Sequence, residues 1–152
     1  EITMESDTKK LTDTTKLLRE CDAGTKMAIS SINEILEKVE DTKLNEILTK
    51  SRNAHEELES EIHSLLNYHK EEQKEPDPIA KGMSFIKTNV KMGIDESDKT
   101  VANLITDGCN MGIKSLNQYL NQYAMADVIS KKITEKLIRL EENLRKELST
   151  YL

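Results

Sequence analysis

The sequence has no tryptophan, and its 152 residues include one phenylalanine and four tyrosines, which excludes an aromatic core. Hydrophobic residues make up 36% of the chain, so a core must consist of Leu, Ile, Val, Met and Ala side chains. Five glycines and two prolines are too few for a turn-rich β protein. A chain of this length can bury a real core within one domain, and these shortages favour an all-α domain.

No run of eighteen apolar residues occurs, which excludes a transmembrane helix. The formal net charge of −6 repels phosphate backbones, and no dense cluster of Lys and Arg reverses this field, so we expect no nucleic-acid partner. We predict an acidic, soluble, cytoplasmic protein. Because the sequence starts at Glu1 rather than at methionine, a removed signal peptide stays open as an alternative.

The two cysteines, Cys21 and Cys109, form no CxxC or CxxxC motif, which excludes a zinc knuckle and a thioredoxin-like site. A free cysteine packs as a small apolar residue, so we expect both thiols to be buried and reduced. A disulfide between them is the alternative, and it depends on their separation in the fold.

Apolar residues recur at intervals of three and four over four long segments, which is the spacing of an amphipathic helix. The predicted helices cover 8–39, about 42–72, 96–123 and 128–152. At or just before the start of each of the first three lie residues whose side chains can cap a helix N-terminus. These are Ser6 or Asp7, Asp41 or Thr42, and Asp95 or Ser97.

Both prolines lie in 73–78, where the apolar periodicity is lost, and we predict a linker there because proline interrupts helices. A short amphipathic segment follows at about 79–92. It is either a short extra helix or an extension of the next helix, bent at Gly93, and both interpretations stay open. Its apolar positions are Ile79, Met83, Ile86 and Val90.

The hairpins 7–72 and 96–152, joined by this linker, predict one domain over 1–152 with the fold of an antiparallel up-down four-helix bundle. In helix lengths and in this hairpin–linker–hairpin plan, the chain resembles the ferritin-like superfamily, in particular its small bacterial members. Functional members carry a di-metal site made of glutamates and ExxH motifs.

The sequence contains no ExxH motif, so the resemblance implies the fold and no catalytic residue. The glutamates of the last helix are placed off its apolar stripe, which runs through Leu137, Leu140 and Leu144. These glutamates are Glu135, Glu141, Glu142 and Glu147.

His55, Glu59 and His63 lie at i, i+4 and i+8 of the predicted second helix and therefore share one face. This spacing can hold Zn²⁺ or another divalent ion. Further glutamates surround the three residues, which is typical of a solvated helix face. We favour that interpretation, and a divalent metal is the one cofactor that the pattern leaves open.

A tight turn near Asp41 would place Asp22 and Thr25 of the first helix level with Glu59 and His55 of the second. A buried Asp22 would need a partner. We favour an Asp22–His55 hydrogen bond that fixes the helix register over a ligand site. The same polar waist has three further candidate residues on the third long helix, namely Asp107, Cys109 and Asn110.

Gly24, Gly108 and Gly112 lie inside predicted helices, where each glycine costs roughly 1 kcal/mol relative to alanine. We expect these positions to allow a neighbouring helix to approach closely. The alternative for the pair Gly108 and Gly112 is a gap that holds a small molecule.

These patterns favour a non-enzymatic bundle that acts by self-association or by binding a protein partner. The alternative is a diverged ferritin-like bundle with a metal or small-ligand site at the polar waist. An enzyme is the less favoured class, because no histidine is placed to activate a serine or cysteine. The expected association surface consists of Met83, Phe85, Ile86, Met92 and Ile94.

Overall fold

The computed structural model describes residues 2–76 and 97–152. In these two ranges the chain forms helices and no strand, so the all-α prediction is confirmed. The predicted helix at 79–92 and the association surface expected at 83–94 lie outside the described residues. The helices are α1 (Ile2–Leu36), α2 (Thr42–Tyr68), α5 (Asp98–Gln122), α6 (Val128–Leu148) and a terminal 3₁₀ helix, η1 (Ser149–Tyr151).

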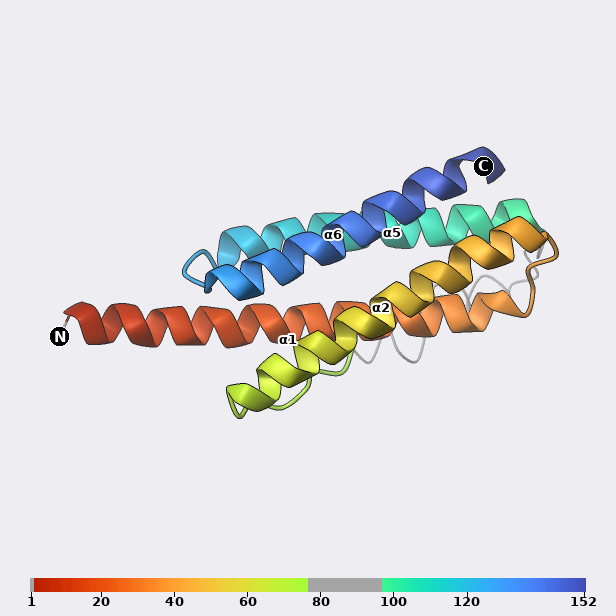
Figure 1. The fold of residues 1–152 in the computed structure, drawn as a ribbon. Coiled ribbons are helices and arrows are strands. Elements are labelled where there is room, and N and C mark those ends of the chain that lie inside the picture. Colours follow the sequence, from red (N-terminus) through yellow and green to blue (C-terminus); the bar gives the residue numbers. More distant parts are fainter. Residues whose placement is uncertain (1, 77–96) are drawn as a thin grey trace.

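Figure 1 shows two helical hairpins side by side, with α2 doubling back along α1 and α6 doubling back along α5. Helix α1 contacts α2, α5 and α6, and α2 also contacts α6. The first turns of α1 project past the loop between α5 and α6 (Figure 1). None of the described helices has the length and apolar composition needed to cross a bilayer.

Side chains cap three of the helices. Asp41 Oδ1 accepts a hydrogen bond from Leu44 N at 3.0 Å, and Ser97 Oγ accepts one from Thr100 N at 3.3 Å, which confirms caps at Asp41 and Ser97. Asp127 caps α6 in the same way. The predicted start of α1 is wrong: α1 begins at Ile2, so the proposed caps at positions 6 and 7 lie inside the helix.

The aliphatic core is divided into two clusters along the bundle. Between them the buried interior is polar, and it includes Thr25, His55 and Glu141. One cluster consists of Ile32, Ile35, Leu44, Ile47, Leu48, Val101, Ala102, Leu104, Ile105, Cys109, Leu144 and Leu148. The other consists of Leu18, Cys21, Leu58, Ile62, Leu66, Leu116, Ile133, Leu137 and Ile138.

At one end of the bundle, Asp98 at the start of α5 holds the turn between α1 and α2. Its carboxylate oxygens accept hydrogen bonds from the backbone N–H groups of Glu40 and Asp41, each at 3.0 Å. Tyr151 adds a bond from its hydroxyl to Asp41 Oδ1 at 3.3 Å. The turn of the first hairpin is therefore fixed by residues of the second.

At the other end, α1 holds the loop between α5 and α6. Asp13 Oδ2 accepts a bond from Met125 N at 3.0 Å, and Thr14 Oγ1 accepts one from Asp127 N at 2.8 Å. Burial alone would raise the pKa of Asp13, but the bonds from Lys9 and Met125 outweigh it and hold that pKa below its ordinary value. Each hairpin thus secures the turn of the other.

We expect Asp98→Ala to lower the free energy of unfolding by about 1–2 kcal/mol, because two backbone N–H groups lose their acceptors. Urea titration followed by circular dichroism measures the change. Asp107→Ala, at an exposed position of the same helix, is the matched control and should stay within about 0.5 kcal/mol of wild type. Equal effects of the two substitutions would contradict the assigned role of Asp98.

Candidate functional site

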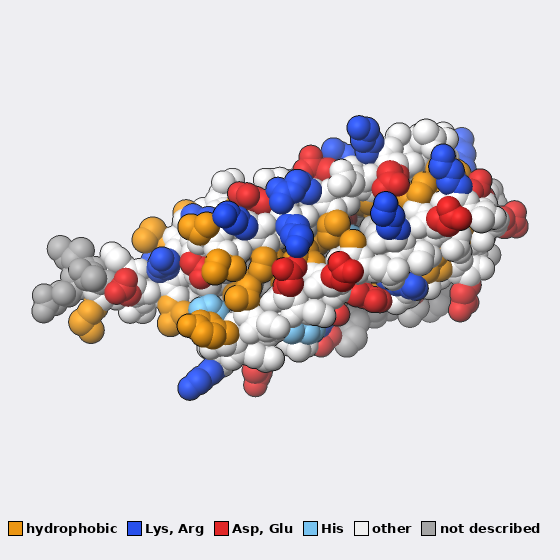
Figure 2. Space-filling model, in the orientation of Figure 1, with side chains coloured by type: hydrophobic (Ala, Val, Ile, Leu, Met, Phe, Trp, Pro, Cys, Tyr) orange, Lys and Arg blue, Asp and Glu red, His pale blue; other side chains and the backbone are white. Residues whose placement is uncertain are grey.

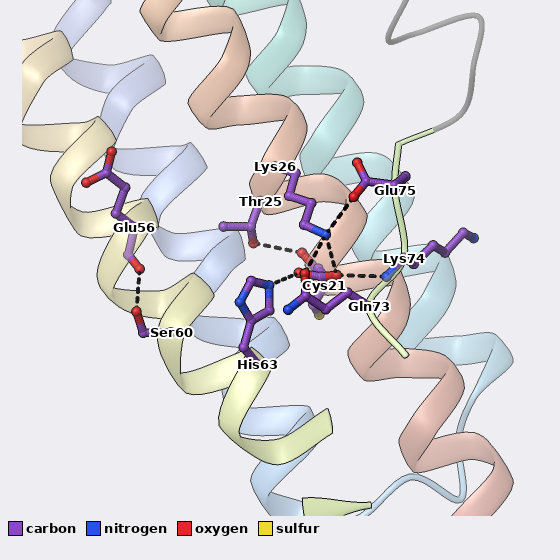
Figure 3. Close-up of polar contacts among 10 residues, drawn as sticks. Cys21, Thr25, Lys26, Glu56, Ser60, His63, Gln73, Lys74 and Glu75 are labelled. Carbon is purple, nitrogen blue, oxygen red and sulfur yellow. Dashed lines mark hydrogen bonds and ion pairs between the residues drawn. The ribbon is translucent and has the colours of Figure 1, made fainter. Parts of the chain in front are cut away.

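A polar group centred on Asp22 joins α1, α2 and the segment that follows α2. Asp22 is fully buried. Its Oδ1 lies 2.7 Å from His63 Nε2, and its Oδ2 accepts bonds from Lys74 N at 2.8 Å and from Lys26 Nζ at 3.2 Å. Figure 3 shows the side chains of His63 from α2 and Lys26 from α1 pointing toward each other between the two helices. Asp22 is thus a buried charge with a full set of partners.

The segment after α2 is fastened to α1 by the same group. Lys26 Nζ donates to Gln73 Oε1 at 3.0 Å and to Glu75 Oε1 at 3.2 Å (Figure 3). Burial would lower the pKa of Lys26, but its bonds to Asp22 and Glu75 outweigh that and raise the pKa. Lys26 therefore stays cationic, and the described part of the predicted linker packs against α1.

Glu59 completes a group of potential metal ligands. Asp22, Glu59 and His63 each offer one ligand atom, and these atoms lie within 4.8 Å of one another. Glu59 and His63 are four residues apart on α2, so they share the face that meets α1. Among the residues that the structure describes, Glu59 forms no hydrogen bond or ion pair.

A second polar group lies between the two core clusters. His55 Nε2 is 2.7 Å from Glu141 Oε1, and His55 Nδ1 is 2.7 Å from the Ser51 carbonyl oxygen. A carbonyl oxygen only accepts, so Nδ1 carries a hydrogen, and a second proton lies between His55 and Glu141. Burial opposes the charge on His55, but the bond to Glu141 outweighs it and raises the pKa of His55.

The two cysteines are buried and free, as the sequence predicts. Burial raises the pKa of Cys21 to about 12, and burial together with the nearby Glu141 raises that of Cys109 well above its ordinary value. Cys21 Sγ lies 3.2 Å from Thr134 Oγ1, whose hydroxyl donates to Ser130 O, so the thiol is the donor. Thiols in this state are poor nucleophiles.

No protein-family model, curated protein or solved structure matches this chain. Membership of the ferritin-like superfamily therefore stays a prediction.

The predicted Asp22–His55 pair is wrong, because Asp22 binds His63 and His55 binds Glu141. The prediction aligned Cα positions across the turn. Side chains in a helix lean toward its N-terminus, and in two helices of opposite direction these leans add. Contacting residues on α2 consequently lie about one turn further along the helix than the aligned Cα positions.

The structure also does not bring together the three candidate metal ligands that the sequence suggested, His55, Glu59 and His63. Glu59 and His63 come together with Asp22, whereas His55 is absent from that group and binds Glu141. Of the waist candidates on α5, Cys109 is buried, while Asp107 and Asn110 are exposed, and Asn110 Oδ1 accepts a bond from Arg145 at 2.9 Å. Only Cys109 of these three therefore reaches the interior.

The glycines do not act as the close-packing sites that the sequence predicts. A Cβ atom added at Gly24 or Gly108 would meet no heavy atom within 4 Å, so these two expectations are wrong. A Cβ at Gly112 would lie 3.7 Å from Glu141 Oε2, which is an ordinary contact. Gly112 faces Glu141 in the polar layer, as we call the buried His55, Glu141 and Thr25 between the two core clusters, and a methyl group would fit there.

Glu141 is the residue that sequence reasoning missed. It was placed off the apolar stripe of the last helix, yet it is 8% exposed. Its position is four residues after Leu137 and three before Leu144, both of which are buried. That spacing is the core-facing spacing of a helix, so it was a usable signal.

The raised pKa of His55 sets a pH dependence of stability. A folded pKa above the unfolded value of 6.5 stabilises the fold fully below pH 6.5, and this contribution is lost as pH rises through the folded pKa. We expect the free energy of unfolding to fall above pH 6.5, measured by urea titration at several pH values. Glu141→Gln should flatten this fall, and an unchanged slope would contradict the assignment.

Removing one member of the buried pair should cost more than removing both. His55→Leu leaves Glu141 buried without a partner, and we expect a loss of about 3–5 kcal/mol in unfolding free energy. The double variant His55→Leu/Glu141→Leu should recover most of this loss, which a double-mutant cycle measures.

The matched control is the exposed ion pair between Lys136 and Glu61, whose side chains are 55% and 52% exposed. Glu61→Gln should cost less than about 1 kcal/mol. Additive losses at His55 and Glu141 would show that the two residues do not act as a pair.

Proposed function

We propose that the protein is a non-enzymatic, antiparallel up-down four-helix bundle of the ferritin-like type, which acts by associating with a second copy of itself. The observation that carries this proposal is a group of exposed hydrophobic side chains where α6 begins. Met125, Val128 and Ile129 are 46%, 64% and 57% exposed, and Leu11 on α1 is 52% exposed. We call these four residues the apolar end.

Contacts between α1 and the loop bring the parts of the apolar end together. Asp13 and Thr14 bind the backbone of Met125 and Asp127, so Leu11 lies within about one helical turn of this loop. Figure 2 shows hydrophobic side chains gathered on one face at this end of the bundle. Exposed apolar groups of this kind are typical of interaction sites.

Charges around the apolar end favour a second copy as the partner. Lys132 and Lys131 follow it on α6, and the exposed Glu71 and Glu72 follow α2. A bond of 3.2 Å between Lys136 and Glu61 shows that the start of α6 and the end of α2 lie at the same end. A two-fold axis through this end would set the lysines of one copy against the glutamates of the other.

The polar layer supports a non-enzymatic role. His55 is occupied by Glu141 and the Ser51 carbonyl, so it has no free nitrogen with which to activate a nucleophile. The same occupancy makes the layer a weak candidate for the metal or small-ligand site expected there. A metal site as a second function is favoured by the group around Asp22 instead.

Light scattering coupled to size exclusion, over a range of concentrations, tests self-association. We expect a mass that rises toward a dimer and a dissociation constant at least about tenfold weaker in Val128→Glu/Ile129→Glu, because two buried charges oppose the contact. Both positions lie in the first turn of α6, where glutamate favours the helix, so the variant should fold.

Met111→Glu is the control, since Met111 is 65% exposed but lies in the middle of α5. This variant should associate as the wild type does. A strictly monomeric wild type at all concentrations, or equal weakening by both variants, would refute association through the apolar end.

A further inference from the structure

The group formed by Asp22, Glu59 and His63 has the composition of a divalent-cation site between α1 and α2. Its three ligand atoms, one nitrogen and two carboxylate oxygens, lie within 4.8 Å of one another. Imidazole and carboxylate ligands suit Zn²⁺ and other first-row divalent ions. We propose that these three residues bind one such ion, with Zn²⁺ as the best match. The proposal does not depend on self-association.

Asp22 is held in a geometry that leaves one oxygen for a cation. Its Oδ2 is fixed by Lys74 N at 2.8 Å and Lys26 Nζ at 3.2 Å, while its Oδ1 is turned toward His63. Hydrogen bonds to the second oxygen of a ligating carboxylate orient it toward the metal and strengthen the site. The backbone bond from Lys74 would serve this purpose whether or not an ion is bound.

Glu59 makes no contact among the described residues that would explain its position by fold stability alone. It is partly buried, and no described residue forms a hydrogen bond or ion pair with it. Its side chain lines an open groove that also includes Lys26 and Asn33, so an ion can reach the site from solvent. A carboxylate that faces an Asp–His pair, and that has no partner among the described residues, is available for a cation.

The three ligand atoms need only a small shift of the side chains to surround one ion. Zn–N and Zn–O bonds are about 2.0–2.2 Å long, so ligand atoms around one ion lie roughly 3–4 Å apart. Glu59 must therefore move inward by about 1 Å, which its side chain allows because it lines an open groove. His63 must give up the hydrogen that its Nε2 shares with Asp22, because a metal-bound imidazole nitrogen carries none.

The positive charge of Lys26 opposes the binding of a cation at this site. Its ammonium group lies 3.2 Å from Asp22 Oδ2 and already neutralises that carboxylate. Replacing Lys26 by glutamine removes a positive charge from beside the cation. The amide N–H of the glutamine can still donate a hydrogen bond to Asp22. The site therefore makes opposite predictions for neighbouring residues: loss of a ligand weakens binding, and loss of Lys26 strengthens it.

Isothermal titration of the chelator-treated protein with zinc chloride at neutral pH tests the site. We expect one Zn²⁺ per chain, with an affinity that falls at least about tenfold in Glu59→Gln and in His63→Gln and rises several-fold in Lys26→Gln. Glu59 and His63 are partly exposed, so these variants should fold. Zinc should also raise the melting temperature of the wild type, since it binds the folded state.

Two variants, one on α2 and one at the residue that directly follows it, are matched controls. Glu56→Gln and His69→Gln remove an exposed glutamate and a histidine that lie outside the triad, and both should bind zinc as the wild type does. No zinc binding by the wild type would overturn the proposal. So would binding that Glu59→Gln and His63→Gln leave unchanged, because the ion would then lie elsewhere.

Discussion

A carboxylate taken out of water must be hydrogen-bonded or neutralised, and an unpaired one costs several kcal/mol. Asp13, Asp22 and Glu141 are buried in this protein, and each satisfies the requirement through a distant segment. Asp13 binds the loop between α5 and α6, Asp22 binds α2, and Glu141 binds His55. An aliphatic core tolerates many helix arrangements, whereas these contacts are satisfied in one of them.

The His55–Glu141 pair has a further consequence because it lies between two apolar clusters. A shift of α2 against α6 by one turn would move both polar groups into aliphatic surroundings. The same shift would bring leucines into the polar layer. It therefore costs free energy for two reasons, unpaired buried polar groups and lost apolar contacts. The pair thus fixes the register of the two hairpins, much as a single buried polar residue fixes the register of a coiled coil.

Local signals in the sequence were sufficient for the four long helices and for the caps of α2 and α5, although not for the start of α1. Asp41 and Ser97 act through bonds to N–H groups three residues away, so no knowledge of the fold is needed to place them. The partner of Asp22 was beyond reach because it depends on side-chain direction in two helices at once. Of the three glycines that were assigned to helix contacts, Gly24 and Gly108 face open space. The reason is related: low helix propensity shows that a position is unusual, but not which way it faces.

The group around Asp22 contains more than its structural task requires. Lys26 and the backbone N–H of Lys74 are enough to neutralise and hydrogen-bond Asp22. His63 adds a further donor, and Glu59 adds a negative charge that gains nothing from the described residues around it. Two carboxylates kept near each other repel unless a cation stands between them. Lys26 partly fills that role for Asp22, and a divalent ion held by Glu59 and His63 would fill it for both carboxylates.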